Sequence, residues 1–368
     1  MRLDKLDIYH VAMPLIYPWR TAYGEDKSIH SVLVRATSGE HTAWSESSPL
    51  FAPTYLSESA GAVFYNVSEI LGPFVIGREY DTAIQLSERL DVFKGNSFAK
   101  AAVEICWWTL TQVMTGRPLH ILLGGETREV VVGADFGIQD SIDMLLGNVQ
   151  VAVDEGYPRV KLKVRRGWDL DVINAVTDTF PDTTFHIDCN AGYTLDDLPF
   201  FKAIDGCGLA FIEQPLHYTD VLDHAELARQ IQTPICLDES ITSVKAAEQA
   251  LSVGACKYVN IKAGRLGGLS NSIAVHDLCQ REGIPVWVGG MLESAMGASI
   301  GVELATLPNF TYPGDIFPSS RFYEQDLSAP PLKLTPRNTF EPFTGELPSP
   351  DPDQLAKLTV SHKCVVPQ

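Results

Sequence analysis

Hydrophobic and polar residues follow two different patterns along the chain. In the first part, alternating hydrophobic residues predict three short strands, over residues 7–15, 31–35 and 42–46. Hydrophobic residues at helical spacing predict three amphipathic helices, over residues 57–71, 82–93 and 98–114. A Gly-Gly pair at positions 124 and 125 then breaks the pattern. We therefore predict an α+β capping domain over residues 1–125.

From residue 126 onward, short runs rich in β-branched residues alternate with helical stretches. The runs are VVVGADFG, PRVKLKV, TTFHIDCN, LAFIEQP, PICLDES, KYVNIKAG and PVWVGGM. The clearest helical stretches between them cover residues 220–231, 243–253 and 270–282. Such alternation is typical of a parallel sheet whose strands are joined by crossover helices.

Charged residues end five consecutive runs at nearly constant intervals of 25, 25, 25 and 24 residues. These residues are Lys163, Asp188, Glu213, Asp238 and Lys262. Strand ends need not converge in a doubly wound sheet, whereas in a (β/α) barrel all of them meet at one mouth. We therefore predict an α/β fold of the (β/α)-barrel type over residues 126–325, and we expect the tail, 326–368, to return to the capping domain.

The strand RVKLKV carries two lysines on one face. Side chains alternate along a strand, so Lys161 and Lys163 share a face while Val160, Leu162 and Val164 share the other. Burying two ammonium groups is costly unless they are paired. If the barrel is correct, the lysines point into its mouth and the aliphatic side chains pack against the helices.

Three carboxylates in register predict a metal site. Asp188, Glu213 and Asp238 end successive strands, and at one mouth they would repel each other strongly without a cation. A ligand set made only of oxygen suits Mg²⁺, with Mn²⁺ as the alternative. The competing interpretation is that each acid is an isolated surface residue at the start of a loop. We also expect Asn190, which has the same strand parity as Asp188, to contact a water or a neighbouring side chain of the metal site.

Lysines on both sides of such a metal suit removal of a proton alpha to a carboxylate. Lys163 and Lys262 end the second and sixth strands, so they would face a metal-bound substrate from opposite sides. The metal stabilises the enediolate while a lysine takes the proton. We expect the positive charge of Lys161 to lower the pKa of Lys163 and make it a base near neutral pH.

Composition narrows the range of partners. The net charge of −18 disfavours a nucleic acid or an anionic membrane as partner. No run of about 20 apolar residues is present to span a membrane, and the first residues lack a signal-peptide core. The seven cysteines have no CxxC spacing, which favours reduced thiols. These features indicate a cytoplasmic protein.

The strand-end motifs resemble the enolase superfamily. KLK, D-x-N, EQP, DES and NIK follow one another on strands two to six. The strand IPVWVGGM has no histidine, so the resemblance is to the muconate-lactonizing subgroup and not to the mandelate racemase subgroup. IQTPICLDESI, NIKAGRLGG, IPVWVGGMLES and LPNFTYPGD are similar to the o-succinylbenzoate synthase and N-succinylamino acid racemase family.

This resemblance implies roles for individual residues. Asp188, Glu213 and Asp238 would bind Mg²⁺, and Lys163 would be the base. Lys262 would stabilise the enediolate in a dehydration or exchange roles with Lys163 in a racemisation. Arg265 stands at a position where family members with racemase activity tend to have an arginine.

The resemblance also implies which residues contact the substrate. Segments 17–24 and 48–55 match two mobile loops over the mouth, which assigns Tyr17, Arg20 and Tyr55 to the substrate. Gly290, Met291 and Glu293 would approach it from the end of the seventh strand. Asp135 stands where relatives commonly carry a small hydroxyl residue. A carboxylate there would repel a dicarboxylate substrate unless it pairs with a cation.

A small carboxylate is therefore the expected substrate, and a metal-dependent lyase or isomerase the expected activity. The resemblance points first to o-succinylbenzoate synthase activity in menaquinone biosynthesis. The alternatives are an N-acylamino acid racemase or dipeptide epimerase, a muconate-type cycloisomerase, and a barrel without catalytic activity. The sequence leaves open whether the protein forms a homo-oligomer.

Overall fold

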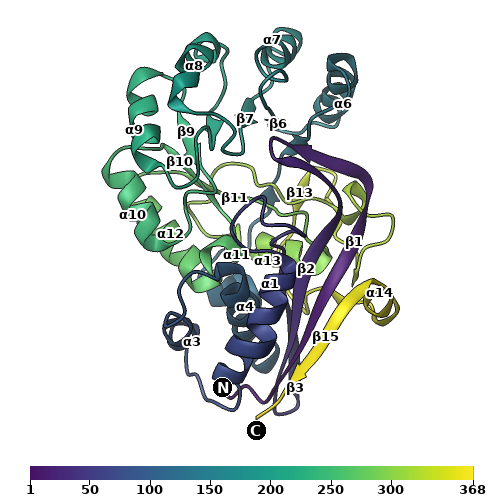
Figure 1. The fold of residues 1–368 in the computed structure, drawn as a ribbon. Helices are drawn as coiled ribbons and strands as arrows, with labels where there is room; N and C mark the ends of the chain where they lie inside the picture. The colour runs from purple at the N-terminus through teal and green to yellow at the C-terminus, as the bar shows by residue number, and fades with distance from the viewer. Residues whose placement is uncertain (368) are drawn as a thin grey trace.

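The computed structural model describes residues 1–367 and contains two main sheets (Figure 1). The first is antiparallel, in the order β15-β1-β2-β3. Its strands are β1 (Lys5–Thr21), β2 (Gly24–Ser38), β3 (His41–Ser47) and β15 (Thr359–Val365). β15 pairs with β1 from Leu6↔Val365 onward, so the tail returns to the N-terminal part as expected. It does so through its last strand, β15, whereas residues 330–336 form no strand.

The β1–β2 hairpin is longer than the sequence predicted. Residues 17–24, which the resemblance assigned to a mobile loop, form the end of β1, a turn and the first residue of β2, because Trp19, Arg20 and Thr21 pair with β2. The register shifts between Pro14 and Trp19, where Pro14 and Pro18 have no N–H to donate to a ladder. This extension carries the hairpin tip over the barrel.

Helices pack on one side of this sheet. They are α1 (Ala60–Tyr65), the π-helix η1 (Asn66–Leu71), α2 (Gly72–Val75), α3 (Ala83–Leu90) and α4 (Ser97–Thr115). The first begins three residues later than predicted, at Ala60, because the Ser59 side chain accepts from the backbone N–H of Ala62 and caps it. α4 contributes Phe98 and Val103 to the core under the sheet and Ala101 and Ile105 to the barrel core. α4 therefore joins the two parts, and the division at residue 125 stays a prediction.

The second sheet is parallel and curled, with its strands in chain order. The strands are β5 (Ala134–Phe136), β6 (Val160–Lys163), β7 (Phe185–Asp188), β8 (Ile212–Glu213), β9 (Ile235–Leu237), β10 (Tyr258–Ile261) and β11 (Val286–Val288). Helices cover its outer side (Figure 1). They include α6 (Ile142–Asp154), α7 (Leu170–Thr179), α8 (Leu198–Ile204), α9 (Val221–Gln230), α10 (Val244–Ser252), α12 (Leu269–Arg281) and α13 (Ala295–Leu304).

An irregular segment, residues 310–315, takes the place of an eighth strand. Phe310 forms a parallel bridge with Val286, and Gly314 forms one with Val132. Pro313 cannot donate to a ladder, which explains why no regular strand forms here. The backbone hydrogen bonds on both sides of the segment close the sheet, and the predicted (β/α) barrel with an α+β cap is confirmed.

The buried carboxylate of Glu104 fixes the start of α12 on α4. It accepts hydrogen bonds from the backbone N–H groups of Leu269 at 2.7 Å and of Ser270 at 3.0 Å. Gly268 has φ +129°, and a Cβ there would lie 2.1 Å from an oxygen of Glu104. Only glycine lets this carboxylate approach the first turn of the helix.

Replacing Glu104 by alanine should lower the free energy of unfolding by about 1–3 kcal/mol, because buried N–H donors lose their acceptor. Urea unfolding of the Glu104→Ala variant measures this loss. The control is Glu248→Ala, since Glu248 is exposed and, among residues 1–367, pairs with Lys245 alone, at 2.9 Å; it should change stability by less than about 0.5 kcal/mol. Equal losses in the two variants would contradict this role of Glu104.

Candidate active site

The register of the barrel strands brings the predicted site residues together. Lys163 lies opposite Asp188, and Asp188 lies opposite Glu213, in adjacent parallel pairs. Asp135 lies opposite Lys161 in the same way. The six central side chains are all buried: Lys161, Lys163, Asp188, Glu213, Asp238 and Lys262. They are therefore not surface residues at loop starts.

Lys161 occupies the centre of the acid cluster. Its Nζ lies 2.9 Å from a carboxylate oxygen of Asp188 and 2.9 Å from one of Glu213. It also donates to Asp315 at 3.0 Å. Lys163 donates to the same oxygen of Asp188 at 2.6 Å. Lys161 thus neutralises three carboxylates directly, besides acting on Lys163 through its charge.

Asp238 is held from the opposite side of the mouth. Lys262 donates to it at 2.9 Å and the hydroxyl of Tyr55 donates to it at 2.9 Å. The buried guanidinium of Arg265 also donates to Asp238 and, at 2.8 Å, to the backbone oxygen of Ile241. Arg265 therefore acts on Asp238 and does not line the cavity described below.

The donor set suits a divalent cation, although the side chains are not arranged around one. Among residues 1–367, no three His, Cys, Asp or Glu side chains are placed to share a metal ion. The ammonium group of Lys161 lies between Asp188 and Glu213, and the carboxylate of Asp238 is paired with Lys262. However, Oε2 of Glu213 is buried and lacks hydrogen-bond geometry even to Lys161. Three buried oxygen donors and this unsatisfied atom fit a hard ion such as Mg²⁺.

The pKa of Lys163 is raised, contrary to the sequence-based expectation. Burial lowers it, but the nearby acidic groups, Asp188 first among them, together outweigh burial. The charge of Lys161 does lower the pKa of Lys163, in the expected direction, and it is the weaker effect. Conversely, burial raises the pKa of Asp188, while Lys161 and Lys163 outweigh burial and hold it well below its usual range. In this arrangement the lysines are ammonium groups and Asp188 is ionised.

A small cavity of about 40 Å³ lies between Lys163 and Lys262. Lys163 and Lys262 line it from the barrel, and Trp19 and Tyr23 line it from the β1–β2 hairpin. It has room for about one water, so substrate entry requires the hairpin or the 48–55 segment to move.

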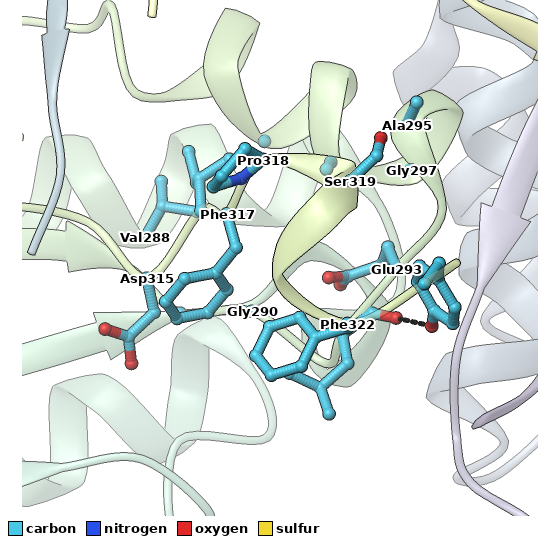
Figure 2. A pocket seen from close by; sticks show the side chains of 16 residues that line it. Val288, Gly290, Glu293, Ala295, Gly297, Asp315, Phe317, Pro318, Ser319 and Phe322 are labelled. Carbon is cyan, nitrogen blue, oxygen red and sulfur yellow. Dashed lines mark hydrogen bonds between the residues drawn. The ribbon is translucent and has the colours of Figure 1, made fainter. Parts of the chain in front are cut away.

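The predicted substrate contacts divide into two groups. Five of them line this cavity: Tyr55, Asn190, Asp135, Gly290 and Met291. Arg20 points away, donating to Glu25 at 2.8 Å and to Asp140. The Tyr17 ring lies under Arg321, whose guanidinium carbon is 5.6 Å from the ring centroid. Glu293 lines a neighbouring cavity with Phe317 and Phe322 (Figure 2).

Sequence reasoning missed several residues of the site. Trp19 lines the cavity while Arg20 does not, which strand alternation in YPWRT indicates once β1 is known to reach Thr21. Asp315, which binds Lys161 and Arg159, was given no role from the sequence. Glu239 has a buried oxygen without a hydrogen-bond partner next to Asp238.

Comparison with known proteins places these features in a family. The model of the enolase C-terminal domain-like family matches residues 145–336. An N-succinylamino acid racemase of Amycolatopsis sp is 42% identical over 331 residues, 90% of each chain. An o-succinylbenzoate synthase of Geobacillus kaustophilus is 38% identical over 91% of this chain and 89% of the relative.

A solved structure shows the same arrangement over the whole chain. The enolase superfamily member from Listeria innocua Clip11262 is 34% identical, with a TM-score of 0.94 over 100% of this chain and 99% of the other. No helix among the described residues combines the length and apolar character that a membrane span needs. The chain therefore belongs to the enolase superfamily, within the family whose members are named o-succinylbenzoate synthase and N-succinylamino acid racemase.

Proposed function

We propose that this protein removes the proton alpha to the carboxylate of a small molecule, with Lys163 as the base. One observation carries the proposal: Lys163 and Lys262 line the same cavity, and each is paired with a different acid of the site, Asp188 and Asp238. Asp188, Glu213 and Asp238 would hold Mg²⁺ or Mn²⁺, which would supply positive charge for the enediolate oxygens.

The proton transfer needs Lys163 as a neutral amine. Its present proton is retained by the contact with Asp188, so weakening that contact lowers its pKa. The free amine then takes the α-proton, and the electron pair of the broken C–H bond moves into the carboxylate to form an enediolate. Lys262 remains an ammonium on the other side of the cavity, because the Asp238 contact stabilises its charge.

Two reactions can follow this shared step, and each has support. Dehydration to o-succinylbenzoate, in which Lys163 returns its proton to a departing hydroxide, is supported by relatives named for that synthase. Racemisation of an N-acylamino acid, in which Lys262 returns a proton to the opposite face, is supported by the two-sided placement of the lysines and by the racemase relative.

Two assays with Mg²⁺ separate these reactions. Incubation with 2-succinyl-6-hydroxycyclohexadiene carboxylate should produce an aromatic ultraviolet band if the protein is the synthase. Incubation of N-succinyl amino acids in D₂O should give deuterium at the α-carbon and loss of optical rotation if it is the racemase. Absence of both signals would exclude these two reactions, and either signal would exclude a barrel without catalytic activity.

Replacing Lys262 by alanine should separate proton exchange from racemisation. Asp238 keeps Arg265 and Tyr55 as partners, so the fold is retained. With Lys163 as the only remaining base, one enantiomer of an N-acylamino acid should still exchange its α-proton, while interconversion falls by at least about 100-fold. Proton NMR in D₂O and polarimetry measure the two rates.

The matched control for this experiment is Lys257→Ala. Lys257 is exposed and lies on the approach to the same strand, β10. It should leave both rates unchanged. Loss of exchange from both enantiomers in Lys262→Ala would rule out independent action of the two lysines.

A further inference from the structure

Asp135 presents an unpaired carboxylate to the cavity. It lies in β5, is 4% exposed, and lines the same cavity as Lys163 and Lys262. Its Oδ1 is buried without a hydrogen-bond partner among the described residues. A buried carboxylate without a partner is unfavourable, so this site is suited to a donor that arrives with a ligand.

The nearby cations are engaged elsewhere. Arg159 donates to the carboxylate of Asp315 and to the backbone oxygens of Ala134 at 3.0 Å and Pro313 at 3.0 Å. Lys161 also contacts Asp315, at 3.0 Å. In the described part of the chain, no lysine or arginine forms an ion pair with Asp135, although several lie close enough to act on it through their charge.

Arg321 approaches Asp135 without satisfying its side chain. The guanidinium donates at 2.9 Å to the backbone oxygen of Asp135. The side chain therefore keeps its acceptor capacity on the barrel side of the cavity, one strand away from Lys163.

We propose that Asp135 determines specificity by accepting a hydrogen bond from a positively charged nitrogen of the substrate and by disfavouring a second carboxylate at that place. A charged N–H donor suits this position because charge-assisted hydrogen bonds to a desolvated carboxylate are the strongest available. The proposal rests on the proposed function, since the substrate must also place its α-carbon between Lys163 and Lys262. The nitrogen belongs either to the acyl arm of an N-acylated amino acid, as in a dipeptide, or to its side chain.

Four substrates test both sources of the nitrogen. For the acyl arm, alanyl-norleucine carries an ammonium where N-succinyl-norleucine carries a carboxylate. For the side chain, N-acetyl-lysine carries an ammonium where N-acetyl-norleucine carries none. The kcat/KM for α-proton exchange in D₂O with Mg²⁺ is measured for each substrate. Within each pair, the value for the ammonium-bearing substrate is divided by the value for its partner. This ratio is then compared between the wild type, Asp135→Ser and Asp135→Asn.

One of the two ratios should fall by about 10-fold or more in both variants. The substrate pair whose ratio falls identifies whether the nitrogen belongs to the acyl group or to the side chain. Asp26→Asn is the matched control, because it also removes a carboxylate from the lining of this cavity. It should change neither ratio by more than about 2-fold. Equal changes in Asp26→Asn and Asp135→Asn would show a general charge effect and overturn the proposal.

A second readout does not depend on activity. If Asp135 has no partner within the protein, Asp135→Asn and Asp135→Ser should raise the midpoint of thermal unfolding by about 2–4 °C. A lower midpoint in both would reveal an internal partner and overturn the proposal. Exchange with both ratios unchanged would also overturn it while leaving the proposed function intact. If no substrate exchanges its α-proton with any protein, the proposed function fails and the specificity proposal fails with it.

Discussion

Lys163→Ala should abolish dehydration, racemisation and every proton transfer on the Lys163 side of the cavity. For the enantiomer whose α-proton faces Lys163, we expect kcat/KM for exchange to fall by at least about 1,000-fold, the effect of losing a positioned general base. Lys262 cannot take over on the same face, because its Nζ is held at Asp238, 2.9 Å away, on the other side of the cavity. For dehydration the loss should be as large, since a single lysine both removes the proton and returns it.

Folding and charge controls keep this result interpretable. Asp188 retains Lys161 at 2.9 Å after the substitution, so its charge stays compensated and the thermal midpoint should remain near that of the wild type. Lys202→Ala removes an exposed lysine from α8 and should leave turnover unchanged. Full turnover by folded Lys163→Ala would refute the mechanism.

Removing divalent metal should stop the reaction, and Mg²⁺ or Mn²⁺ should restore it. Dialysis against EDTA is expected to lower turnover by at least about 100-fold, because the lost cation would contribute several kcal/mol to the transition state. Adding Mg²⁺ to the metal-free protein should also raise its thermal midpoint, since a ligand that binds only the folded state stabilises it. Unchanged turnover after EDTA would contradict the metal assignment.

Glu213→Gln isolates one carboxylate of that site. Glutamine keeps the shape and still accepts the 2.7 Å hydrogen bond from Asn260, but it removes the charge facing Lys161. Both the Mg²⁺-dependent rise in thermal midpoint and the turnover should be lost. The matched control is Glu226→Gln, which neutralises a partly exposed glutamate paired with Arg229 and should keep both signals.

The residues that end regular strands were the easiest to predict from the sequence. The 25-residue spacing located Lys163, Asp188 and Glu213 because a parallel register places successive strand ends side by side. No regular spacing in the sequence indicates which side chains contact each other across the barrel. The position of Lys161 between two acids, and the raised pKa of Lys163 that accompanies it, depend on distances that one sequence does not contain.

Irregular segments were the hardest to predict. Asp315 is the last residue of a segment in which Pro313 prevents a regular strand, so no hydrophobic alternation indicated its position in the sequence. The extension of β1 to Thr21 depends on pairing with polar residues of β2, which a hydrophobic pattern does not reveal. For this reason, the segment that carries Trp19, which lines the cavity, was predicted to be a loop.

The pairing of β15 with β1 has a consequence for synthesis on the ribosome. Leu6 meets Val365, so β1 keeps one edge of unpaired N–H and C=O groups until the whole barrel has been translated. The N-terminal sheet of the nascent chain therefore keeps this edge unpaired, and able to pair with other strands, until β15 emerges after the barrel. Protection of the β1 amides that face β15 should appear in stalled nascent chains only when residues 359–365 have left the exit tunnel.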